Sequence, residues 1–134
     1  MKKKLPPTIT VEIAPGELID RITILEIKSE RFSDAVKLQN VREELKKLIE
    51  ARDRNVAMSR QLSGLAAQLK AVNERLWQIE DDLRACERQG DFGSRFVELA
   101  RSVYRENDQR ALLKRQINLL LGSRLIEEKS YTPY

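Results

Sequence analysis

Several polar side chains occupy helical positions where an apolar core residue is expected, and their chemistry is that of an anion-binding site. In the predicted helix from about 94 to 121, Asn107, Lys114 and Asn118 lie on one line of the apolar face, and Arg110 lies at its edge. Lys and Arg side chains that converge in a partly buried site can bind a carboxylate or a phosphate. These four residues are therefore the first candidates for a ligand site.

Two other predicted helices carry polar groups of the same kind. Glu26 falls within the apolar face of the helix from about 17 to 32, and Asn73, Glu80 and Arg84 follow a row beside a leucine seam in the helix from about 59 to 88. An unpaired buried carboxylate is costly, so we expect packing of the three helices to bring the carboxylates of Glu26 and Glu80 close to cations. The full set of candidate ligand-binding residues is Glu26, Asn73, Glu80, Arg84, Asn107, Arg110, Lys114 and Asn118.

Three interpretations are open for this polar set. The first is a satisfied hydrogen-bond network that fixes the register of the helices. The second is a pocket for a small polar or anionic ligand, held by Lys114 and an arginine. The third is acid–base catalysis by Glu26 and Glu80. We assign no residue as catalytic and none as a metal ligand, because no spacing matches a metal motif, and we expect no cofactor.

The composition excludes several classes of function. Histidine is absent and Cys86 is the only cysteine, so histidine-dependent catalysis, an intramolecular disulfide and a Cys- or His-based zinc site are excluded. The net charge is +4, but Lys2, Lys3 and Lys4 supply three of these charges and the other bases alternate with acids, so we expect no nucleic-acid binding.

The chain contains no apolar run that could span a membrane and no signal peptide, so we expect a cytoplasmic protein. We expect residues 1–7 to form a disordered basic tail and residues 8–134 to form a single helical domain. Half of the 134 residues are Ala, Glu, Lys, Leu or Arg, a composition typical of long helices.

We predict helices over about 17–32, 35–54, 59–88 and 94–121. The leucine spacing slips by one residue between 50 and 60, and Ser59 is a good N-cap, which places a turn near 54–58. One continuous helix over 35–88 is the alternative. The segments Thr8–Ile13 and Arg124–Tyr131 are predicted strands that pair with each other. The expected fold is all-α, an antiparallel bundle of three to four helices with a minor two-stranded β ribbon formed by the terminal segments.

The third predicted helix carries an uninterrupted apolar seam. Its members alternate at spacings of three and four residues, which is the pattern of a helix that packs against a partner helix: Leu62, Leu65, Leu69, Val72, Leu76, Ile79 and Leu83. A chain with few aromatic residues has little with which to cover so long a seam. We therefore expect a homodimer formed through Leu62–Leu83, or packing with another helical protein.

Four blocks of the chain carry a resemblance to a known family: GELIDRITILEIKSER (16–31), NERLWQIEDDLR (73–84), DFGSRFVELARSVYRENDQRALLKRQIN (91–118) and EEKSY (127–131). Together they resemble a small bacterial family known only as a domain of unknown function, over about residues 9–131. Some members are joined to, or lie near, glycosyltransferases of surface-polysaccharide synthesis. The first three blocks contain all eight candidate residues.

From the residues and the resemblance we expect an uncharacterised cytoplasmic binding or scaffold module, accessory to surface-polysaccharide synthesis. The alternative is a small protein that binds an anionic ligand, or a small enzyme, using the polar set between the helices.

Overall fold

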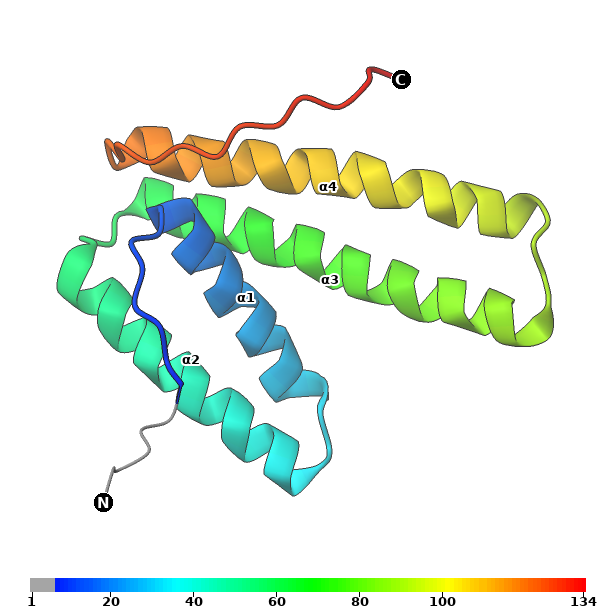
Figure 1. Ribbon diagram of the computed structural model, residues 1–134, viewed down its shortest axis with the longest axis horizontal. Helices are drawn as coiled ribbons and strands as arrows, with labels where there is room; N and C mark the ends of the chain where they lie inside the picture. Colours follow the sequence, from blue (N-terminus) through cyan, green and yellow to red (C-terminus); the bar gives the residue numbers. More distant parts are fainter. Residues whose placement is uncertain (1–6) are drawn as a thin grey trace.

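The computed structural model describes residues 7–134 and contains four helices, which form two hairpins (Figure 1). The helices are α1 (Pro15–Arg31), α2 (Ala35–Asn55), α3 (Arg60–Gln89) and α4 (Ser94–Leu120). Helix α1 packs against all three other helices, whereas α2 packs only against α1. The predicted all-α fold is confirmed. The tail expected over 1–7 lies outside the described residues, apart from Pro7.

The helix ends follow the capping residues of the sequence. The side chain of Asp34 accepts a hydrogen bond from the Lys37 amide at the start of α2, and that of Ser59 accepts one from the Leu62 amide at the start of α3. Gly90 ends α3 in the left-handed conformation, with φ of 67°. The turn between α2 and α3 confirms the predicted break, so the alternative of one helix over 35–88 is wrong.

The core lies where one half of the α3–α4 hairpin meets α1. Its centre consists of six buried apolar residues from the three helices: Ile19, Leu62, Leu69, Val72, Leu113 and Ile117. Leu62 and Leu69 have no exposed surface, because α1 covers the first half of the α3 seam. The first half of the seam is therefore already occupied within the chain.

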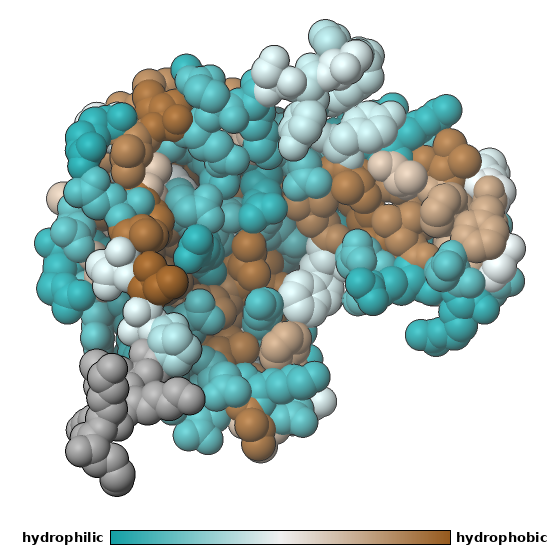
Figure 2. Space-filling view, viewed as in Figure 1, coloured by the Kyte–Doolittle hydropathy of each residue, from teal (hydrophilic) through white to brown (hydrophobic). Residues whose placement is uncertain are grey.

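The other half of the hairpin, which we call the arm, consists of residues 78–106 and extends beyond α1 (Figure 1). The second half of the seam lies partly here, and Ile79 and Leu83 are only half-buried. Figure 2 shows apolar side chains gathered on the surface of this extension. Phe92, Val97 and Tyr104 are exposed by 55%, 42% and 41%. The arm thus lacks the third helix that completes the core elsewhere.

The predicted β ribbon is wrong, since no strand forms anywhere in residues 7–134. The C-terminal segment instead runs along α4, where Arg115 binds Glu128 and the hydroxyl of Tyr134 donates to Asp108. The N-terminal segment lies near the α2–α3 turn, and the two segments meet through the ion pair of Glu12 and Arg124. An alternating β-rich segment has no stability as a strand without a partner strand beside it.

Helix α1 can dock closely on α4 only because residue 16 is a glycine. A Cβ atom at Gly16 would lie 2.4 Å from the backbone oxygen of Lys114 and 2.8 Å from Oδ1 of Asn118. Such distances are far inside van der Waals contact, and the first involves a backbone atom that side-chain rotation does not move. The start of α1 and the backbone of α4 are therefore in direct contact.

We expect Gly16→Ala to lower the free energy of unfolding by about 2–3 kcal/mol, because α1 must move away from α4. Gly64→Ala is the matched control, since nothing lies within 4 Å of a Cβ there and α3 is helical. That variant should gain about 0.5–1 kcal/mol. Urea unfolding monitored by circular dichroism measures both. Equal effects of the two substitutions would contradict the close approach.

Candidate functional site

The carboxylate of Asp20 lies at the centre of the contact between α1 and the α3–α4 hairpin. Asp20 has no exposed surface. Arg110 of α4 binds it through two hydrogen bonds, with Nε 2.9 Å from Oδ1 and Nη2 2.6 Å from Oδ2. This bidentate geometry fixes both the distance and the orientation of the two helices.

Helix α3 joins the same network through Asn73. Its side-chain nitrogen Nδ2 donates to Oδ1 of Asp20 at 3.0 Å and to Oγ1 of Thr23 at 2.9 Å. The hydroxyl of Thr23 in turn donates to the backbone oxygen of Asp20 at 2.7 Å. Asp20, Thr23, Asn73 and Arg110, which we call the Asp20 network, therefore connect three helices through one buried carboxylate.

A second group of contacts secures the start of α1 against α4. The backbone amide of Gly16 donates to Oδ1 of Asn118 at 2.7 Å. One turn earlier on α4, Nζ of Lys114 lies 2.7 Å from a carboxylate oxygen of Glu17 and 2.8 Å from one of Glu127. Asn118 thus satisfies an amide at a helix start, which has no partner within the helix itself.

The contacts favour the ionised forms of Arg110, Lys114 and Glu17. The hydrogen bonds with Asp20 raise the pKa of Arg110, despite its burial. Burial alone would lower the pKa of Lys114, but the hydrogen bonds with Glu127 and Glu17 more than offset this and raise it. Burial likewise acts to raise the pKa of Glu17, yet Lys114 and Arg21 bring it below its usual 4.5. Each shift moves the pKa further from neutrality, opposite to what a general acid or base requires.

Four of the eight predicted residues, Asn73, Arg110, Lys114 and Asn118, lie in these contacts, and the other four do not. Glu80 pairs with Arg84 along α3, at the surface of the arm, with side chains 57% and 75% exposed. Glu26 is half-buried on α1, and Asn107 is half-buried on α4. Glu80 therefore meets one of the expected cations, Arg84, but neither Glu26 nor Glu80 pairs with Arg110 or Lys114. Arg110 instead binds Asp20, which is closer to the start of α1. Lys114 binds Glu17 in the first turn of α1 and Glu127 in the C-terminal segment.

Sequence reasoning missed Asp20, Thr23, Glu17 and Glu127. Gly16, Asp20, Thr23 and Ile27 follow one line of α1, and all four are buried. A single apolar face therefore describes α1 poorly, because the helix contacts α2 on one side and the α3–α4 hairpin on another. The line of small or polar residues from Gly16 through Asp20 to Thr23 was the signal in the sequence that could have indicated a second contact surface on α1. Glu127 belongs to the segment Arg124–Tyr131, which was predicted to form a strand.

The polar cluster is fully satisfied, so its geometry fits a positioning role. Among the described residues, no buried side-chain nitrogen or oxygen lacks a hydrogen-bond partner. The cavity beside Lys114 measures about 160 Å³, and the two carboxylates already bind its ammonium group. No group of three or more Cys, Asp or Glu residues in the described part could hold a metal ion.

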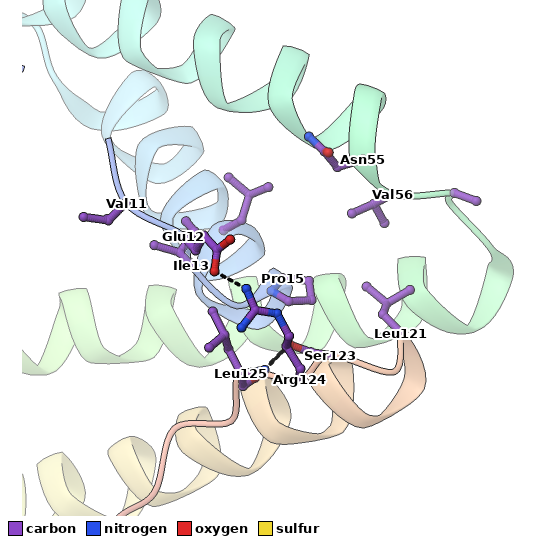
Figure 3. Close-up of a pocket in the computed structure, with 12 residues that line it drawn as sticks. Val11, Glu12, Ile13, Pro15, Asn55, Val56, Leu121, Ser123, Arg124 and Leu125 are labelled. Atoms are coloured by element: carbon purple, nitrogen blue, oxygen red, sulfur yellow. Dashed lines mark hydrogen bonds and ion pairs between the residues drawn. The ribbon is translucent and has the colours of Figure 1, made fainter. Parts of the chain in front are cut away.

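A larger hollow of about 590 Å³ lies at the end of the bundle, between the terminal segments and the α2–α3 turn (Figure 3). Val11, Ile13, Val56 and Leu125 contribute apolar side chains to its wall. Arg124 reaches across toward Glu12, and both of these side chains are about three quarters exposed. None of the described residues that line the hollow is a buried polar residue that could orient a ligand.

Over residues 7–134, no helix has the length and apolar character needed to cross a membrane.

The model of a protein family, described as "Family of unknown function (DUF6165)", matches residues 9–134. The chain therefore belongs to this family, as the sequence blocks indicated. No curated protein and no solved structure matches the chain.

Removal of one partner of the buried pair tests the Asp20 network. We expect Arg110→Met to lower the free energy of unfolding by about 3 kcal/mol, because the counter-ion of Asp20 then no longer compensates the burial of its carboxylate. Asp20→Asn in the same chain removes that charge and keeps an oxygen for Asn73, so the double variant should recover at least half of the loss. Additive losses in a urea-unfolding double-mutant cycle would contradict the coupling.

Proposed function

We propose that this member of the family is a non-catalytic protein-binding module whose binding surface is the arm of the α3–α4 hairpin. The observation that carries the proposal is an apolar groove of about 540 Å³ along the arm. Leu83 of α3 and Phe96, Ala100 and Val103 of α4 contribute its apolar lining. The remaining lining is polar and comes from α3, namely Glu80, Arg84 and Glu87.

The position of the groove supports this role. On a helical projection, Leu83 lies in the same line of α3 as Leu62 and Leu69, which share the core with Ile19 of α1. Phe96, Ala100 and Val103 likewise share a face of α4 with Lys114 and Asn118, which contact α1. The groove is therefore the continuation of the surface on which α1 packs. A surface of this kind binds the apolar face of a helix.

The alternative, a site for a small anionic ligand, requires cations that are free to bind it. Arg110 is bound by Asp20, and Lys114 is bound by Glu17 and Glu127. A ligand would have to displace these carboxylates, so the geometry favours the binding module. The setting that the resemblance implies, a bacterial cytoplasm and an accessory role in surface-polysaccharide synthesis, belongs to this proposal.

A photo-crosslinking amino acid placed at Ala100 tests the proposal in cells that make the protein. Ala100 lines the groove and is exposed, so a bulky residue there should not disturb the fold. Leu119 is the matched control, because it is 59% exposed on the same helix but lies outside the arm. We expect discrete protein adducts from position 100 and none from position 119. Absence of adducts at position 100, or the same adducts at both positions, would overturn the proposed function.

A further inference from the structure

The groove on the arm has a geometry that restricts what can occupy it. Helix α1 stands on the same face of the α3–α4 hairpin and ends beside the arm, where Phe32 at its C-terminal end contacts Trp77 of α3 at a ring distance of 6.0 Å. An occupant therefore lies in the same layer as α1, next to its C-terminal end. Its length is limited to that of the arm, about 18 Å for the twelve residues 78–89 of α3.

We infer that the occupant is the arm of a second copy of this chain, packed face to face and antiparallel. This inference rests on the proposed function and names its partner. Two identical two-helix arms, each with one apolar face uncovered, together complete a four-helix bundle. Each arm then covers the apolar face of the other arm, as α1 covers the rest of the hairpin within one chain.

The orientation follows from the position of α1. If the two arms pointed in the same direction, both α1 helices would stand in the space between the hairpins and collide. If the arms point in opposite directions, each α1–α2 hairpin lies beyond the end of the other arm. The antiparallel arrangement is therefore the one that leaves room for both copies, and it pairs the α3 helices of the two arms.

The charges on the groove side of α3 fit an antiparallel second copy. Glu80, Arg84 and Glu87 line the groove and alternate in sign along the helix. When two such helices run antiparallel, the two-fold axis can place Glu80 of each copy opposite Arg84 of the other. Glu80 and Arg84 form an exposed pair within the isolated chain, so both are free to exchange partners without loss of core contacts.

The size of the arm predicts a weak dimer. Two helices about 18 Å long and about 20 Å wide together bury on the order of 1,000 Å² in total when paired, at the low end of specific interfaces. Such interfaces exchange readily, so we expect monomer and dimer to coexist at micromolar concentration. Sedimentation equilibrium over a range of concentrations measures this directly.

Two charge variants give the decisive experiment. Arg84→Glu makes the groove side of α3 acidic, and Glu80→Arg makes it more basic; both remove the same pair within the chain, and both sites are exposed. We expect each variant alone to dimerise about tenfold more weakly than the parent, because like charges meet across the two-fold axis. An equimolar mixture should recover the association, because the heterodimer places opposite charges together.

A second comparison separates apolar packing from charge. Ala100→Glu places a carboxylate on the groove lining and should abolish dimerisation, whereas Leu119→Glu should leave it unchanged. Two results would overturn the inference that a second copy is the partner. One is that the parent protein is a monomer alone at high micromolar concentration, and the other is that the mixture of the charge variants associates no better than either variant alone. Photo-adducts at position 100 with a different protein would also overturn the second copy as the partner, but they would support the proposed protein-binding function.

Discussion

The buried carboxylate of Asp20 is the constraint on which the rest of the fold depends. A charge without solvent access needs a counter-ion and hydrogen bonds, and the observed placement of α1 on α3 and α4 supplies them. Apolar packing by itself is non-directional and permits several helix registers. The bidentate bond from Arg110 and the amide of Asn73 select one of these registers. Gly16 and Asn118 then fix how closely the start of α1 approaches.

The uncovered arm follows from this placement. Helix α1 has 17 residues and is about 26 Å long, whereas α3 has 30 residues and is about 45 Å long. Since the Asp20 network holds α1 at the end of the hairpin where α3 begins, the opposite end extends past it. Helix α2 does not cover this surface, because among the four helices it packs against α1 alone. The same contacts that determine the core therefore leave an apolar groove at the opposite end, which is the binding surface that we propose.

Local signals in the sequence predicted the helices well. Asp34, Ser59 and Gly90 act through atoms within a few residues, so their roles follow from residue type. Of the polar line on α4, Lys114 and Asn118 contact α1 whereas Asn107 does not, and Asn73 contacts α1 from α3. The partners of these residues were harder to predict. Asp20 lies between two contact surfaces of α1, and which of them a residue faces depends on tertiary packing. The terminal segments resemble strands in their alternation, but their charged side chains bind α4 and each other.

Hydrogen exchange of the Gly16 amide tests most directly whether the docking of α1 depends on these buried polar contacts. The second residue of a helix ordinarily exchanges rapidly, since its amide has no partner within the helix. Our account predicts that the Gly16 amide, bound to Asn118, exchanges only with global unfolding, as slowly as the amides of Leu113 and Ile117 in the core. Arg95 is the matched comparison, because it is the second residue of α4 and the start of that helix lacks a side-chain cap. If the Gly16 amide exchanged as fast as the Arg95 amide, the result would contradict the dependence of α1 docking on these contacts.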